Sequence, residues 1–247
     1  MFFHLRPKRA IVSDANVELI NAYKVIRDQL DSLIEALGIL QRKQVSQSLY
    51  DYYRRLNPEK LSPLDRAVRF IFLNKTCFNG LYRVNSQGRF NVPFGKYSRM
   101  PTLFEPTNLV EIRKLLMRAD VMCAGYEIAL DRTRDGDFAY IDPPYSPEPG
   151  SSNFTSYTKE SFSKVDQKRL AAKFKELDRK GCLLMLSNSD TPLVNSLYSK
   201  YFKHRVRADR MINCVGSERT GYHELLIVNF NFQAPVDTLL PWVKRNA

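Results

Sequence analysis

The sequence Tyr140-Ile141-Asp142-Pro143-Pro144-Tyr145 continues a short apolar run that begins at Phe138 and predicts a buried strand. Proline cannot continue a strand ladder, so the two prolines predict a stiff turn at the carboxyl end of that strand. Ligands bind at this edge of open α/β sheets. The Asp142 carboxylate and the Pro143 carbonyl are both acceptors that together can hold an exocyclic NH2 group, and Tyr145 can stack on its ring. A proline-rich turn that merely leaves the sheet is the alternative.

Length and composition indicate one large α/β domain, or one domain with a sizeable insertion. The chain has 247 residues, of which 44% are hydrophobic, and this is enough for a substantial core. It carries 38 Lys and Arg residues against 26 Asp and Glu residues, a net charge of +12. Such an excess favours a polyanionic partner. A soluble protein that is merely basic is the alternative.

The spacing of the cysteines and the length of the apolar runs indicate which cellular compartment to expect for the protein. The four cysteines stand far apart and include no C-x-x-C pair, which favours reduced thiols and gives no indication of a metal site. No run approaches the roughly 18 apolar residues that a membrane-spanning helix needs. The first residues lack the apolar core of a signal peptide. We therefore expect a cytoplasmic protein without a bound metal and without a membrane partner.

A second acidic residue follows a predicted strand near the start of the chain. Residues 10–13 predict a strand that ends in Asp14, and apolar residues at helical spacing follow from Val17. An acid at the end of the second strand of a Rossmann-type fold binds ribose hydroxyls, but Asp also caps helices. The residues alone leave both roles of Asp14 open. Residues 1–13 contain no glycine, so the first strand and Gly-rich turn of such a fold are not found there.

The second informative stretch is residues 74–95. Two short runs flank residues 85–88, whose sequence Asn-Ser-Gln-Gly is typical of a hairpin with glycine at a positive φ. In the DNA major groove, arginine pairs with guanine and Asn or Gln pairs with adenine, and a two-stranded ribbon fits that groove. A polar surface hairpin is the alternative. The side chains of interest near the tip are Arg83, Asn85, Gln87 and Arg89.

These motifs resemble those of the amino-group DNA methyltransferases, in particular the Dam-type adenine-N6 branch. The resemblance rests on the strand that ends in Asp-Pro-Pro-Tyr at residues 142–145 and on the Asp-x-Asn pattern that opens a helix at Asp14. It rests also on the segment that ends in Phe-Asn-Val-Pro-Phe-Gly at residues 90–95. It covers about residues 10–230, nearly the whole chain.

The resemblance implies a fold and an activity. The fold is a Rossmann-like α/β methyltransferase sheet, formed by residues 1–30 and 112–247 without the first strand and Gly loop. Residues 31–111 are expected as a helical DNA-recognition insertion that bears the hairpin. The activity is transfer of a methyl group from S-adenosyl-L-methionine to N6 of a flipped-out adenine in double-stranded DNA. GATC is the best single prediction for the recognition sequence.

The resemblance also implies roles for individual residues. At the catalytic centre we expect Asp142, Pro143, Pro144 and Tyr145. At the cofactor we expect Asp14, Gly125, Tyr126 and Asp142, although ordinary core packing of Tyr126 is an equal alternative. At DNA we expect Arg83, Asn85, Gln87, Arg89, Asn153, Tyr157 and Arg219.

Other interpretations stay open at this point. An amino methyltransferase that acts on RNA or on protein side chains is one of them, but such enzymes more often carry Asn in place of Asp142 and lack the hairpin segment. A DNA-binding fragment that lost catalysis together with the Gly loop is another. For the resembled activity, a cognate restriction endonuclease in the same system and a monomeric state are further expectations.

Overall fold

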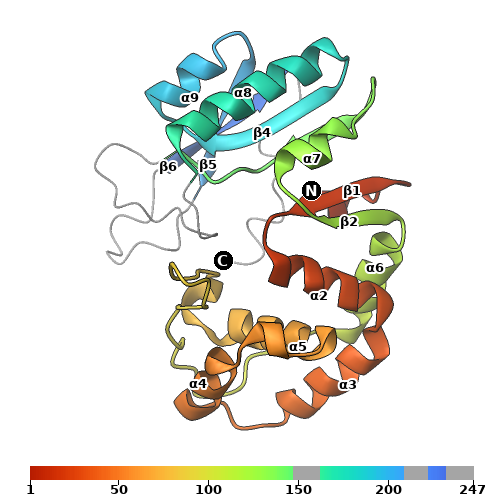
Figure 1. Ribbon diagram of the computed structural model, residues 1–247, viewed down its shortest axis with the longest axis vertical. Coiled ribbons are helices and arrows are strands. Elements are labelled where there is room, and N and C mark those ends of the chain that lie inside the picture. Colours follow the sequence, from red (N-terminus) through yellow and green to blue (C-terminus); the bar gives the residue numbers. More distant parts are fainter. Residues whose placement is uncertain (147–161, 209–221, 232–247) are drawn as a thin grey trace. The chain divides into compact units, whose positions relative to one another are not determined.

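The computed structural model describes residues 1–146, 162–208 and 222–231 (Figure 1). Among them the chain forms two compact units, which meet in sequence between Ala129 and Leu130. Each unit contains a parallel pair of strands together with helices, so the predicted α/β class is confirmed. None of the helices in these ranges is long and apolar enough to span a membrane. The predicted division at residues 31 and 111 stays a prediction.

The first unit contains one parallel pair of strands. Strand β1 (Ala10–Asp14) pairs with β2 (Ala119–Cys123), and the register places Asp14 opposite Cys123. The carboxyl ends of the two strands therefore meet at one edge. Ser13 Oγ donates to the Ala124 carbonyl at 2.9 Å, and the Ala124 amide donates to the Asp14 carbonyl at 3.2 Å. These bonds tie the chain that leaves β2 to the end of β1, where Cys123 is exposed.

Helices make up most of the first unit. Polar caps begin several of them, since the side chains of Asn16, Ser46 and Ser62 each accept a backbone amide of the first turn. A break at Gln29, with φ −135°, separates the second helix from the third. The helices are α1 (Phe2–Leu5), α2 (Val17–Asp28), α3 (Leu30–Gln41), α4 (Gln47–Arg55), α5 (Pro63–Thr76) and α6 (Pro106–Leu116), with the short η1 (Pro58–Lys60) and η2 (Phe78–Gly80) between them.

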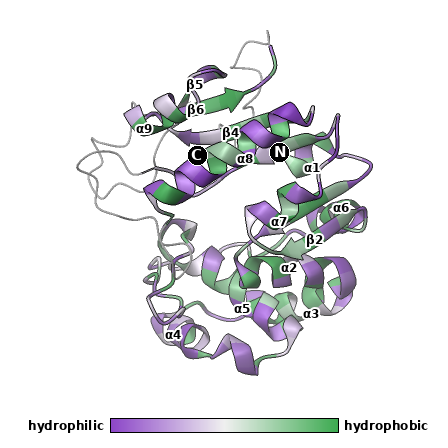
Figure 2. Ribbon diagram, turned by 45° about the horizontal axis from the view of Figure 1, so that its top comes forward, coloured by the Kyte–Doolittle hydropathy of each residue, from purple (hydrophilic) through white to green (hydrophobic). Residues whose placement is uncertain are grey.

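The core of the first unit lies between α2, α3, α5 and the strand pair. Leu33, Leu37 and Phe72 are fully buried in it, and each such side chain contributes roughly 1.5–3 kcal/mol on burial. The helices carry apolar stretches beside polar ones (Figure 2), as helices that cover a core do. The core also contains one buried carboxylate: Glu18 of α2 accepts a hydrogen bond from Arg66 of α5, which is half-buried. It ties the start of α2 to α5.

The stretch that predicts a hairpin folds back on itself. Antiparallel bridges join Cys77 to Phe94 and Val84 to Phe90. The tip is closed by a bond of 2.8 Å from the Gly88 amide to the Asn85 carbonyl, and Gly88 has the positive φ (75°) that its position requires. The paired segments are bridges rather than a regular ladder. The predicted reversal of the chain at residues 85–88 is confirmed.

The second unit is built on a mixed sheet of strand order β3-β4-β6-β5. Strand β3 (Phe138–Ile141) is parallel to β4 (Leu183–Ser189), whereas β6 (Tyr222–Val228) is antiparallel to both β4 and β5 (Phe202–Ala208). The short helix α7 (Tyr126–Asp131) precedes β3 in the chain and spans the division between the units.

Helix α8 (Lys164–Arg179) covers one face of this sheet and lies along β4 (Figure 1). Ser163 and Asp166 form a reciprocal capping box that fixes where the helix begins. Its buried face contains Leu170, Phe174 and Leu177. The short helix α9 (Pro192–Leu197) follows β4 and ends before Tyr198, which leaves helical geometry with φ −112° and ψ 29°.

Candidate active site

The turn after β3 places an exposed carboxylate beside the neighbouring strand. The register pairs Ile141 with Leu186, so Asp142 and Ser187 follow side by side. Ser187 Oγ donates to Asp142 Oδ1 at 2.6 Å. No described residue forms a hydrogen bond with the second carboxylate oxygen, Oδ2. The serine thus fixes the orientation of the carboxylate and leaves one oxygen for a ligand.

A second hydroxyl supports the serine from behind. Tyr140 Oη and Ser187 Oγ are 3.3 Å apart. Because the single proton of Ser187 is given to Asp142 in the shorter contact, the phenol is the donor in this pair. Partial burial raises the pKa of Tyr140, and the negative charge of Asp142 raises it further. The phenol therefore stays protonated at neutral pH and keeps donating to Ser187.

The aromatic residue of the turn is held from another strand. Tyr145 Oη donates to Glu224 Oε2 of β6 at 3.2 Å. Burial raises the pKa of Tyr145, with further increases from the charges of Asp142 and Glu224, so its phenol too is protonated at neutral pH. The ring is half-buried, so part of its surface stays exposed. One end of the ring is thereby anchored while part of the side chain stays open to a ligand.

Buried amides bond the backbone of the same turn. Gln167 Nε2 donates to the Pro144 carbonyl at 3.0 Å, and the Ser146 amide donates to Asn188 Oδ1 at 3.0 Å. The Pro143 carbonyl, by contrast, accepts no hydrogen bond from the residues that the structure describes. Pro143 is a buried residue, and of the two proline carbonyls its own is the one without a hydrogen-bond partner among these residues.

At the carboxyl edge of the β1–β2 pair lies the second predicted acid. Asp14 is exposed, and its Oδ1 accepts the Asn16 amide at 2.7 Å. The cap of α2 is Asn16 itself, whose side chain accepts the amides of Glu18 and Leu19 at 3.0 and 3.3 Å. Capping the helix, the alternative role of Asp14, therefore belongs to Asn16.

The chain that leaves β2 provides space and a ring at this same edge. Gly125 is exposed, and a Cβ atom there would meet nothing within 4 Å. Tyr126 is half-buried and its Oη donates to Glu127 Oε1 at 3.3 Å. An acceptor carboxylate, open space and an aromatic ring suit a nucleoside, whose ribose hydroxyls are donors and whose base is planar.

The predicted DNA-contacting side chains of the hairpin differ in their surroundings. Arg83 is half-buried, and its Nε donates to Asn91 Oδ1 at 2.8 Å. Asn85 Oδ1 accepts the amides of Gln87 and Arg89 at 3.0 and 2.9 Å, so this oxygen builds the turn. The side chains of Gln87 and Arg89 are exposed. The other predicted contacts, Asn153, Tyr157 and Arg219, lie outside the described residues.

From the sequence, no role was predicted for Ser187, Gln167 or Glu224, whose side chains form hydrogen bonds with residues of the turn. For two of them the sequence contains a pattern that could have indicated a buried polar contact. Ser187 is one of several polar residues that end an otherwise apolar strand, and Gln167 stands at helical spacing with Leu170 and Phe174 on an apolar face. A polar residue on such a face needs a buried partner. Nothing local distinguishes Glu224.

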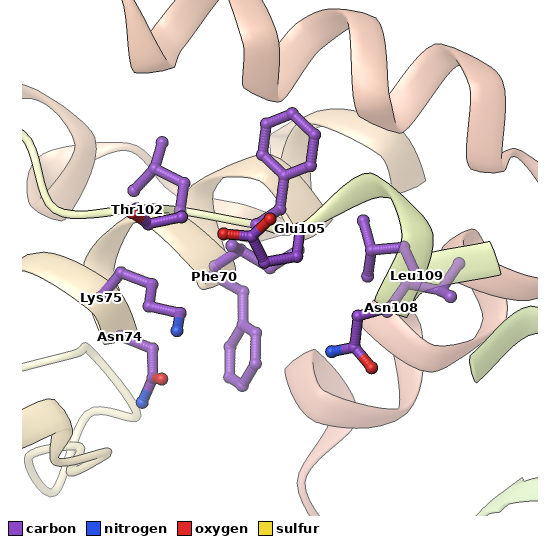
Figure 3. Close-up of a pocket in the computed structure, with 11 residues that line it drawn as sticks. Phe70, Asn74, Lys75, Thr102, Glu105, Asn108 and Leu109 are labelled. Carbon is purple, nitrogen blue, oxygen red and sulfur yellow. The ribbon is translucent and has the colours of Figure 1, made fainter. Parts of the chain in front are cut away.

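A cavity of about 420 Å³ lies elsewhere in the first unit (Figure 3). Phe70, Asn74 and Lys75 line it from α5, and the opposite wall comes from the start of α6 with Glu105 and Asn108. None of the predicted catalytic, cofactor-binding or DNA-contacting residues is among its lining residues. The cavity therefore gives no support to the predicted site.

Comparison of the sequence with known proteins identifies relatives of this chain. The sequence profile described as "D12 class N6 adenine-specific DNA methyltransferase" matches residues 1–212. Type II methyltransferase M.MjaIII of Methanocaldococcus jannaschii is 42% identical over 235 residues, which cover 90% of this chain and 81% of that protein. Type II methyltransferase M1.LlaDCHI of Lactococcus lactis subsp. cremoris is 39% identical, with 93% and 82% covered. DNA adenine methylase of Escherichia coli K12 is 31% identical, with 92% and 81% covered.

Proposed function

Because the chain belongs to the D12 class N6 adenine-specific DNA methyltransferase family, we propose that it methylates N6 of an adenine flipped out of duplex DNA at GATC sites. We propose S-adenosyl-L-methionine as the methyl donor. The observation that carries the proposal is the pair of free acceptors on one turn, Asp142 Oδ2 and the Pro143 carbonyl, with Ser187 holding the first in place.

The turn acts on the attacking amine. The lone pair of an adenine amine is delocalised into the ring, so the nitrogen is a weak nucleophile. Asp142 and the Pro143 carbonyl accept hydrogen bonds from its two N–H groups and favour a pyramidal nitrogen whose lone pair points at the methyl group. S-Adenosyl-L-methionine, when bound, supplies an electrophilic methyl group on sulfur. The Asp142 carboxylate stabilises the positive charge that develops on nitrogen, so catalysis combines positioning with electrostatics.

Tyr145 serves the flipped base. Extruding a base from a duplex costs a few kcal/mol. A stack between a base and an aromatic ring returns roughly 1–3 kcal/mol of this. The hydrogen bond to Glu224 fixes the ring of Tyr145 before the base arrives, and this lowers the entropy that stacking must overcome. Pro144 contributes through the stiffness of the backbone.

We propose that the edge of the β1–β2 pair binds the cofactor. Asp14 accepts the ribose hydroxyls, Gly125 leaves room for the nucleoside, and Tyr126 stacks on the adenine. Asp142 also belongs to the proposed cofactor-binding residues. The exposed position of Asp14 and the open space at Gly125 support this assignment.

We propose that the hairpin reads the target sequence. Arg83 and Arg89 supply guanidinium groups, and Asn85 and Gln87 supply amides, of the kinds that pair with base edges in the major groove. The net charge of +12 supports attraction to DNA. Two relatives are named Type II methyltransferases, and this supports a restriction endonuclease as partner of the same system.

The proposal is tested by methyl transfer from labelled S-adenosyl-L-methionine to unmethylated plasmid DNA. We expect label in N6-methyladenine, and sequencing of the modified positions is expected to give GATC. Duplex RNA of the same sequence is the control and should take up no label. Label at another motif would contradict GATC alone, whereas label on RNA or no label at all would contradict the proposed DNA activity.

Replacing Arg83 by alanine is expected to lower the preference for the recognition sequence by about 10- to 100-fold, because a bidentate contact with guanine is worth about 1–3 kcal/mol of discrimination. The measurement compares methylation of a GATC duplex with that of a duplex in which the guanine is replaced. Arg55→Ala, which removes an exposed arginine of α4, is the control. Equal losses of rate on both duplexes would assign Arg83 to the phosphates instead.

A further inference from the structure

We propose that Gln167 and Asn188 are positioning residues that lock the catalytic turn from behind. The inference rests on the proposed role of Asp142 and Pro143, since it concerns how their turn is held. Both side chains are buried and each of their polar atoms already forms a hydrogen bond within the protein, so neither residue is placed to contact a substrate. Their role is therefore to act through the backbone of the turn.

The two side chains form a chain of hydrogen bonds that ends on the turn at two points. Asn188 Nδ2 donates to Gln167 Oε1 at 3.1 Å. Gln167 Nε2 in turn donates to the Pro144 carbonyl at 3.0 Å. At the other end, Asn188 Oδ1 accepts the Ser146 amide at 3.0 Å and the Ser189 amide at 2.9 Å. The backbone is thus held on both sides of Tyr145.

Burial makes this pair sensitive to change. Gln167 is 1% exposed and Asn188 is 0% exposed. In such surroundings a hydrogen bond is strong, but an unpaired amide or carbonyl is costly. Removing one member would leave the Pro144 carbonyl or the Ser146 amide without its partner in a dry environment, so the turn would have to move to find another.

Both residues come from rigid elements. Gln167 lies in the first turn of α8, directly after the capping box of Ser163 and Asp166. Asn188 lies in β4, between β3 and β6 in the sheet. Their positions are therefore set by the fold and are independent of the substrate. This is the arrangement expected of groups that preorganise an active site.

The consequence for catalysis concerns the Pro143 carbonyl. The peptide planes on either side of Pro144 share a short stiff backbone, so fixing the Pro144 carbonyl also fixes the direction of the Pro143 carbonyl. A displacement of about 1 Å at a reacting group can lower the rate on the order of 100-fold. The hydrogen bonds of Gln167 and Asn188 keep the Pro143 carbonyl directed at the substrate amine. The bond from Gln167 also occupies the Pro144 carbonyl, which therefore does not compete for the amine.

The test begins with Gln167→Met, which preserves volume but neither donates nor accepts as an amide does. We expect kcat to fall about 10- to 100-fold, with KM for DNA and for S-adenosyl-L-methionine unchanged within about twofold. Asn188→Leu should behave alike. The double variant should lose little more than either single variant, because the two residues act as one unit.

A matched control separates positioning from stability. Asn229 also bonds buried backbone with its amide, since it accepts the Leu184 amide at 2.7 Å and donates to the Cys182 carbonyl at 2.9 Å. These bonds lie at the opposite end of β4 from the turn. Asn229→Ser should lower the melting temperature without lowering kcat. Equal losses of kcat in Asn229→Ser and Gln167→Met would overturn the positioning role.

A second readout needs no activity. The exchange of the Ser146 amide hydrogen, measured by NMR in deuterated water, should accelerate about 10-fold or more in both variants, because its acceptor is lost or displaced. Unchanged exchange would overturn the inference even in an inactive protein. Gln167→Glu, which keeps the acceptor for Asn188 but loses the donor to Pro144, covers the case in which Gln167→Met does not fold. An inactive wild-type protein with accelerated exchange in the variants would contradict the proposed function alone.

Discussion

Replacing Asp142 by alanine is expected to lower methyl transfer on the order of 1000-fold while DNA affinity changes little. In the proposed mechanism the carboxylate accepts a hydrogen bond from the amine and stabilises the positive charge that develops on nitrogen. Removing one such transition-state contact lowers the rate about 100- to 1000-fold. The affinity for DNA depends on other groups. Single-turnover transfer from labelled S-adenosyl-L-methionine gives the rate, and fluorescence anisotropy of a labelled duplex gives the affinity.

Two further variants make this prediction sharper. Ser187→Ala removes the bond of 2.6 Å that orients the carboxylate but keeps the carboxylate itself, so a smaller loss of about 10-fold is expected. Asp135→Ala removes an exposed acid that precedes β3 and should leave the rate unchanged. Near-normal turnover in Asp142→Ala would refute the proposed role of the turn, whatever Ser187→Ala does.

Asp14→Ala is expected to weaken the binding of S-adenosyl-L-methionine by about 100-fold or more, because hydrogen bonds to a charged acceptor are worth about 1.5–3 kcal/mol each. The fold should persist, since the cap of α2 is Asn16. Isothermal titration calorimetry measures the cofactor affinity directly and needs no turnover. DNA affinity should stay within about twofold, because this acid contacts no phosphate.

The control for this variant is Asp28→Ala, at the opposite end of α2. Asp28 is exposed and bonds only to Arg27 among the contacts described, at 2.8 and 2.9 Å. We expect its removal to leave cofactor binding unchanged. If Asp14→Ala binds the cofactor as tightly as the wild-type chain does, the ribose role of Asp14 is wrong.

Local patterns predicted the elements that carry the site. The apolar run before Asp142 became β3, the acid at residue 14 ended β1, and Gly88 took the positive φ that its place in the turn requires. The prediction that β3 is buried was only half right, because Phe138 and Tyr140 are exposed while Ala139 and Ile141 are buried. The features that were predicted depend on neighbours in sequence, such as proline stiffness and turn chemistry. The same patterns carried the resemblance to the family, which the sequence comparisons confirm.

Contacts between distant residues could not be predicted in this way. Ser187 meets Asp142 only because β3 and β4 pair in one particular register. Gln167 reaches Pro144 only because α8 packs on that sheet. The break at Gln29 is another example, since helical periodicity continues through it and backbone geometry alone separates α2 from α3. Sequence spacing predicts where an element lies, but its partners depend on packing.

The cysteine that ends β2 offers a route to spectroscopy. Cys123 is exposed, whereas Cys77 and Cys182 are buried, and burial raises the pKa of Cys77 to about 11. Thiol reagents attack the ionised, accessible form, so a maleimide dye at neutral pH selects Cys123 from these three. With Cys214, which lies outside the described residues, replaced by serine, a single fluorophore would stand opposite Asp14 in the register of the sheet. Its emission would follow ligand arrival at that edge in real time, molecule by molecule.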